Sequence, residues 1–125
     1  MSYSLKQMAE SMAPADGSYR AWITCAKGKA PNFKIAPALS SGQPIRGIPY
    51  LQAITTEFHP QSGQLCLICH GTAMMIFIEG RGLEKLADLI GEHTIRTISV
   101  YDPERHTSPP DNQQPVITSI TVEKS

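Results

Sequence analysis

The stretch LCLICHGTAMMIFIE, residues 65–79, decides the fold of this 125-residue chain. It contains two short apolar runs, 65–70 and 73–79, separated by Gly71 and Thr72, which suit a tight turn. A turn this short permits only antiparallel pairing, so the two runs are predicted to form a hairpin. Both runs are apolar at consecutive positions. We therefore expect both strands at the centre of a sheet, with both faces covered.

Further strands are predicted on either side of this hairpin. Residues 48–58 (IPYLQAITTEF) read as one long strand, and the turn residues 59–64 join it to the hairpin as an antiparallel meander. Strands are also predicted at 18–26, 94–101 and 116–123, where β-branched and aromatic residues dominate.

Two helices are predicted from apolar residues at helical spacing. A main helix covers 82–90 and ends at Gly91, and its apolar stripe consists of Leu83, Leu86, Ala87 and Ile90. A short helix covers 4–12, with the same i, i+3, i+4, i+7 spacing behind a capping box.

This order of elements predicts an α+β fold in a single domain, residues 1–125. We expect a mainly antiparallel twisted sheet, or a small barrel of about five or six strands similar in shape to the OB fold. Two long loops are predicted at about 27–47 and 102–115, and the first has room for a short strand at 33–35. Loops of this length are often functional.

Charge is distributed unevenly along the chain. Residues 1–56 contain six basic and two acidic residues, whereas residues 57–125 contain five and nine, so the neutral total hides two oppositely charged halves. No acidic residue occurs from Gly17 to Thr56. The basic residues of that stretch are Arg20, Lys27, Lys29, Lys34 and Arg46. Such asymmetry steers charged partners.

The N-terminus lacks the basic region and apolar run of a signal peptide, and no apolar run approaches the ~20 residues of a membrane helix. We therefore expect a cytoplasmic protein that does not bind membranes. In a reducing compartment, Cys25, Cys66 and Cys69 are free thiols.

Residues 66–70, CLICH, match the C-x-x-C-H spacing of covalent haem attachment. On a strand, however, Cys66 and Cys69 point to opposite faces and cannot hold one haem or one metal ion. The histidines show no metal-ligand spacing that would complete a site. We expect neither a cofactor nor a metal.

No catalytic motif is present, so our leading hypothesis is a small non-catalytic binding module. Its partner would be another protein or a second copy of the chain. The alternative is a nucleic-acid-binding module, because interleaved basic and aromatic residues suit single strands. A thiol-dependent enzyme or a metal or haem protein is the second, disfavoured alternative. The candidate binding residues are Arg20, Trp22, Lys27, Lys29, Phe33, Lys34 and Arg46.

Overall fold

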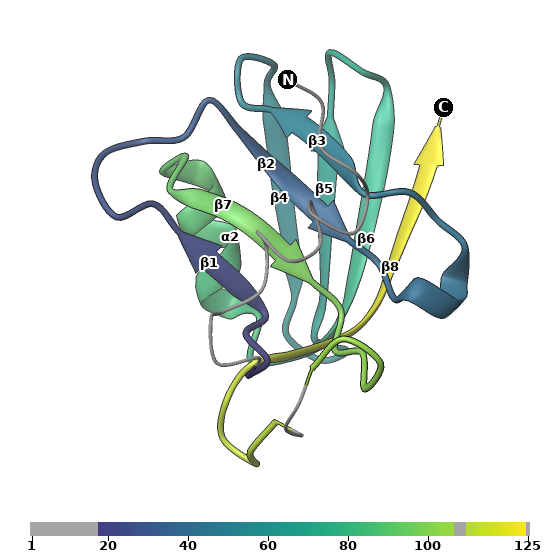
Figure 1. The fold of residues 1–125 in the computed structure, drawn as a ribbon. Coiled ribbons are helices and arrows are strands. Elements are labelled where there is room, and N and C mark those ends of the chain that lie inside the picture. The colour runs from purple at the N-terminus through teal and green to yellow at the C-terminus, as the bar shows by residue number, and fades with distance from the viewer. Residues whose placement is uncertain (1–17, 107–109, 125) are drawn as a thin grey trace, which may run out of the picture.

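The computed structural model describes residues 18–106 and 110–124, which form eight strands, a short 3-10 helix η1 and one α-helix, α2 (Figure 1). The predicted helix at 4–12 lies outside the described residues. In chain order the elements are β1 (Trp22–Thr24), β2 (Asn32–Ala36), η1 (Leu39–Ser41), β3 (Arg46–Pro49), β4 (Ile54–His59), β5 (Gln64–Cys69), β6 (Met74–Arg81), α2 (Glu84–Gly91), β7 (Ile95–Ser99) and β8 (Val116–Lys124).

The strands form two four-stranded sheets. Sheet 1 has the order β1-β7-β2-β3, and sheet 2 has the order β4-β5-β6-β8. All neighbouring strands are antiparallel except β2 and β7. The predicted hairpin is confirmed, because Leu65 pairs with Ile78 and Cys69 with Met74, and both of its strands are central in sheet 2. The α+β class and the mainly antiparallel pairing are therefore as predicted.

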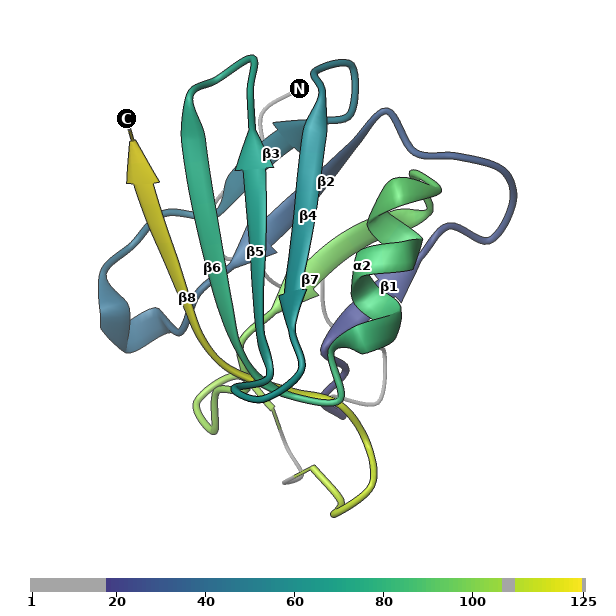
Figure 2. The same ribbon diagram turned by 180° about the vertical axis from the view of Figure 1, so that it is seen from behind.

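The inner faces of the two sheets share one apolar layer. Sheet 2 stands behind sheet 1 in Figure 1, and the strands of the two sheets cross diagonally. Helix α2 lies beside β4 and continues the layer of sheet 2 (Figure 2). The largest fully buried side chains are Phe33, Ile35, Ile48, Leu65, Leu67, Ile76, Ile78, Leu83, Leu86, Ile90, Ile95 and Ile98. Within the described part of the chain, no helix is long and apolar enough to cross a membrane.

The predicted small barrel of five or six strands is wrong. The two sheets remain separate, because the chain leaves sheet 1 after β3 and enters sheet 2 at β4. The single strand predicted at 48–58 is broken at 50–53 for the same reason. Tyr50 is buried and its hydroxyl donates a hydrogen bond to the carbonyl oxygen of Ile95 at 2.8 Å, whereas Leu51 is fully exposed. The chain turns between these two residues.

The prediction that β5 and β6 have both faces covered is also wrong for the described residues. Leu65 and Leu67 point into the shared apolar layer, but Ile68 on β5 and Phe77 on β6 are half-buried on the other face. No described element covers that face (Figure 2). The consecutive apolar residues of β5 and β6 therefore belong to a sheet with one buried face and one apolar face that no described element covers.

The remaining predicted boundaries differ mainly in sheet 1. The strand predicted at 18–26 is confined to the three residues of β1, and the loop predicted at 27–47 holds β2, η1 and the start of β3. The elements predicted at 82–90, 94–101 and 116–123 are present as α2, β7 and β8. The described part of 102–115 contains neither helix nor strand.

Polar contacts hold the two sheets and the 102–106 turn in place. The Tyr19 hydroxyl donates to the carbonyl oxygen of Ser99 at 2.7 Å and accepts a hydrogen bond from the Ile117 N–H at 2.9 Å. Asp102 Oδ2 accepts a hydrogen bond from the Leu39 N–H at 2.8 Å. Arg105 Nη2 donates a hydrogen bond to the carbonyl oxygen of Pro37 at 2.7 Å. The second long loop is therefore anchored at its N-terminal end, where Asp102 and Arg105 both bind the segment 37–39.

Gly80 marks a close approach between β6 and β8, where the register shifts. A Cβ at this position would lie 1.9 Å from the carbonyl oxygen of Val116. We expect Gly80→Ala to lower the free energy of unfolding by roughly 2–3 kcal/mol, because two backbones must separate. The control Gly47→Ala on β3 places its Cβ where no atom lies within 4 Å. It should change stability by less than about 0.5 kcal/mol. Urea denaturation measures both variants, and equal effects would contradict the close approach.

His106 should make stability depend on pH. Burial lowers its pKa below the ordinary value, against the opposing effect of its hydrogen bond with the Asp102 backbone. The unfolded chain therefore binds a proton that the folded chain excludes, so the free energy of unfolding falls as the pH drops below about 6.5. Denaturation across this range should show a weaker pH dependence for His106→Asn than for the wild type. An unchanged dependence would assign the effect to other groups.

Candidate interaction surfaces

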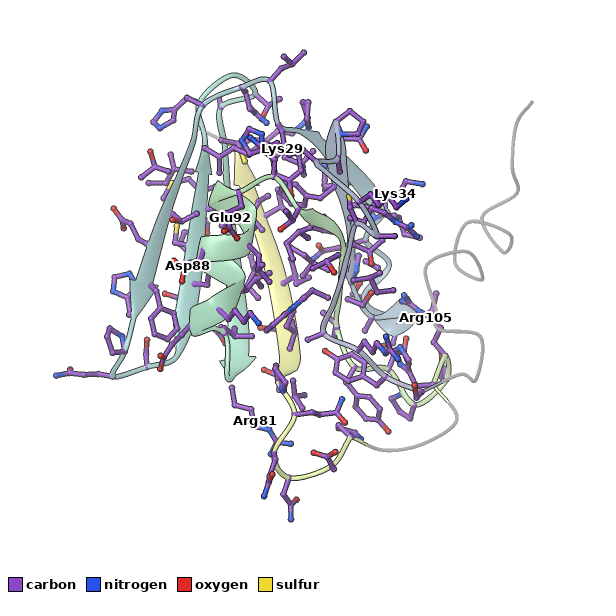
Figure 3. All side chains as sticks on the ribbon, turned by 90° about the vertical axis from the view of Figure 1, so that its left-hand side faces the viewer. Lys29, Lys34, Arg81, Asp88, Glu92 and Arg105 are labelled. Atoms are coloured by element: carbon purple, nitrogen blue, oxygen red, sulfur yellow. The ribbon has the colours of Figure 1, made fainter. Side chains whose placement is uncertain are left out.

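Charge is divided between the two sheets. The strands of sheet 1 carry no acidic residue, and their basic residues are Lys34, Arg46 and Arg96. The strands of sheet 2 carry three acidic residues on their outer face, Glu57, Glu79 and Glu123, and end in two basic residues, Arg81 on β6 and Lys124 on β8. Because the inner faces of the sheets pack together, their outer faces lie on opposite sides of the molecule. Lys34 points away from sheet 2 in Figure 3.

A basic hollow of about 380 Å³ opens on the outer face of sheet 1. It lies where β2 and β7 pair in parallel, with Lys34 opposite Thr97. Three of its residues are basic, none is acidic, and none of the three forms an ion pair with a described residue. The hollow is lined by Cys25, Lys29, Ala30, Pro31, Asn32, Lys34, Arg96 and Thr97.

The loop that carries Lys29 is held against the segment before β7. Two backbone hydrogen bonds of 2.8 Å fix it, from the Cys25 N–H to the carbonyl oxygen of Thr94 and from the Ala30 N–H to that of His93. The backbone of Lys29 is therefore positioned at the hollow by the fold itself, which reduces the cost of ordering it around a ligand.

The structure brings together only some of the predicted binding residues. Lys29 and Lys34 meet in the basic hollow, and Lys27 is exposed on the same loop as Lys29. Arg96 joins them, although sequence reasoning missed it. No local pattern links residues 34 and 96, because only the parallel pairing of β2 with β7 makes them neighbours.

The other predicted residues lie apart from the basic hollow. Arg20 and Trp22 line a separate hollow at the β1 edge of sheet 1, and Arg46 lies on β3 at the opposite edge. Phe33 is fully buried, with its ring centroid 5.1 Å from that of Tyr50, so it is not available to stack on a ligand. No aromatic residue lines the basic hollow, which weakens the case for a single-strand groove.

The outer face of sheet 2 is apolar at its centre. Two cross-strand pairs of β5 and β6 make it contiguous, Cys66 with Phe77 and Ile68 with Met75. Three acidic residues surround these four, and we call the whole surface the acidic-rimmed face. The acidic residues are Glu57 on β4, Glu79 on β6 and Glu123 on β8.

The rim is ordered by hydrogen bonds across the strands. The carboxylate of Glu79 accepts hydrogen bonds of 3.4 Å from Gln64 Nε2 and from Ser119 Oγ. Burial raises the pKa of the Cys66 thiol, and the carboxylates of Glu57 and Glu123 raise it further. The negative electrostatic potential of the rim therefore extends to Cys66 at the apolar centre of the face.

The two cysteines of the C-x-x-C-H motif point to opposite faces of β5, as predicted. Cys69 belongs to the shared apolar layer, whereas Cys66 lies on the acidic-rimmed face. His70 Nε2 lies 2.9 Å from Thr55 Oγ1 in a hydrogen bond between side chains. Among the residues that the structure describes, no group of three His, Cys, Asp or Glu side chains could hold a metal ion.

Comparison with protein-family models, with characterised proteins and with solved structures gave no match for this chain.

The three thiols should differ in reactivity. Cys25 is half-buried, whereas Cys66 and Cys69 are buried and burial raises the pKa of both thiols. Because the thiolate is the reactive form, we expect a disulfide reagent to modify one thiol quickly in the native protein and all three after unfolding. Cys25→Ala should remove the fast phase. A fast phase that persists in this variant would show that β5 opens readily.

Proposed function

We propose that this chain is a non-catalytic interaction module that binds a second copy of itself head to tail. The acidic-rimmed face of one copy would receive the basic outer face of sheet 1 of the next. The observation that carries this proposal is the arrangement of two complementary surfaces. The outer face of sheet 2 is uncovered by described elements and has an apolar centre with an acidic rim. The outer face of sheet 1, on the opposite side of the molecule, is basic, and its strands contain no acidic residue.

The apolar centre supports the binding role of this face. Ile68, Met75 and Phe77 are only half-buried, yet they adjoin one another and the buried Cys66. Soluble monomers seldom expose a large contiguous apolar patch unless it binds something. A dry apolar centre inside a polar rim is also the usual layout of a protein interface.

The charges select the partner surface. The three carboxylates of the rim disfavour an acidic partner, whereas the basic side of sheet 1 carries Lys29, Lys34 and Arg96 without ion pairs to described residues. Opposite potentials favour encounter and fix the register of docking. Because the two complementary surfaces lie on opposite sides of one molecule, the contact joins different surfaces and repeats from copy to copy.

The size of the face limits the affinity. Strands about 4.8 Å apart and about 3.3 Å per residue make the face about 15 Å by about 20 Å. This corresponds to the small, transient class of interfaces rather than to an obligate dimer. The association should therefore depend on protein concentration, and it should weaken with salt because its charges are exposed.

Sedimentation velocity tests this proposal with two charge-reversed variants. Glu57→Lys/Glu123→Lys alters only the acidic-rimmed face, and Lys34→Glu/Arg96→Glu alters only the basic face. The wild type should show a mass that rises with concentration at low salt and falls at high salt. Each variant alone should be monomeric, because it keeps one functional surface. An equimolar mixture should associate, because each variant supplies the intact surface that the other lacks.

The control Glu84→Lys/Glu104→Lys reverses two exposed charges on α2 and on the 102–106 turn, outside both surfaces. It should associate like the wild type. A wild type that stays monomeric at low salt would overturn the proposal. A mixture that stays monomeric, or variants that associate alone, would exclude the head-to-tail contact.

A further inference from the structure

We infer that the basic hollow is a binding site for a small ligand that carries a phosphate-like oxyanion. This inference shares Lys29, Lys34 and Arg96 with the basic face of the proposed head-to-tail contact. It does not rest on self-association, because its test measures binding of a small anion and not association of the chain with itself. Its basis is that Lys29, Lys34 and Arg96 line one hollow together with Thr97, whose buried hydroxyl has no hydrogen-bond partner among the described residues.

The three cations line one hollow and make it positive. They come from the 25–31 loop, from β2 and from β7, so the fold rather than the sequence brings them together. None has a described carboxylate within ion-pair distance. Like charges gathered without counter-charges repel one another, and a bound oxyanion removes that repulsion while it accepts several charge-assisted hydrogen bonds.

Thr97 gives the hollow a polar base. Its register partners are Ile23 on β1 and Lys34 on β2, so these three side chains share the outer face of sheet 1. Thr97 is only 4% exposed, and its Oγ1 is buried without a described partner. A buried hydroxyl of this kind costs roughly 1–3 kcal/mol. A ligand oxygen would satisfy the hydroxyl once the lining of the hollow shifts to admit that oxygen, because Oγ1 itself is buried.

The other residues that line the hollow indicate the chemical class and size of the ligand. Ala30 and Pro31 form an apolar part of the wall, and Asn32 adds an amide. The volume of about 380 Å³ falls in the range of small-molecule sites and exceeds the needs of a lone phosphate ion. The hollow therefore fits a phosphorylated small molecule with a compact organic body.

Calorimetric titration with inorganic phosphate and with pyrophosphate tests the site. The variant Thr97→Val keeps the shape of the side chain and every charge, and it removes only the hydroxyl. We expect it to weaken pyrophosphate binding about three- to tenfold. Lys34→Gln and Arg96→Gln should each weaken binding about tenfold or more, because each removes a charged donor. The control Lys85→Gln on α2 should bind like the wild type.

Thermal unfolding separates a binding defect from a folding defect. Without ligand, Thr97→Val should be as stable as the wild type or more stable, since valine removes an unpartnered hydroxyl and suits a strand. With pyrophosphate, the rise in Tm of the wild type should shrink in this variant. Equal binding by the wild type, Thr97→Val and Lys34→Gln would overturn the inference. Tight binding of a single-stranded oligonucleotide that Thr97→Val does not weaken would also overturn it, in favour of a nucleic-acid surface.

Discussion

The whole structure depends on one shared apolar layer between two sheets. A sheet in a two-layer fold can bury only one of its faces, and here the inner faces of sheet 1 and sheet 2 bury each other, with α2 completing the second layer. The side chains between the inward-facing residues of each strand point outward. The outer faces of the sheets are therefore free to differ in chemistry, and they differ in the sign of their charge.

The route of the chain converts a charge bias along the sequence into a charge difference across the molecule. The early strands β1, β2 and β3 build sheet 1, and the break at 50–53 sends the chain into sheet 2, where the acidic strands begin. Strand β7 then returns to sheet 1 and inserts between β1 and β2. This single return adds Arg96 and Thr97 beside Lys34 and completes the basic hollow.

The parts of the fold that could be predicted are those specified by neighbouring residues. The hairpin at 65–79 and the helix around Leu86 follow from short turns and from helical spacing. The pairing of β2 with β7 joins residues about sixty positions apart, and no local pattern encodes it. The barrel was predicted because the switch between sheets at 50–53 looks, in sequence, like the middle of a strand.

The same distinction applies to the candidate sites. The acid-free segment predicts Lys29 and Lys34 as binding residues. Side chains alternate between the two faces of β2, and this alternation places Phe33 in the core and Lys34 on the outer face. Which residues face the core depends on the register of the strand, and a sequence that resembles a loop does not reveal that register. On β5, apolar residues at consecutive positions suggested two buried faces. Residues at protein interfaces are often apolar as well. Consecutive apolar residues on a strand therefore do not distinguish a face covered within the fold from a face that binds a partner.

Local features of both surfaces lower the stability of the isolated chain. Folding alone does not require cations without described ion pairs around a hollow, a buried hydroxyl without a described partner, or apolar Met75 and Phe77 on an outer face. Sequences are locally consistent with their folds except where function demands otherwise. These three departures fall on the two outer faces, whereas the shared layer is built from apolar side chains; a further buried group without a described partner, Arg105 Nε, lies in the 102–106 turn. That separation supports binding, rather than folding, as the reason for the chemistry of the outer faces.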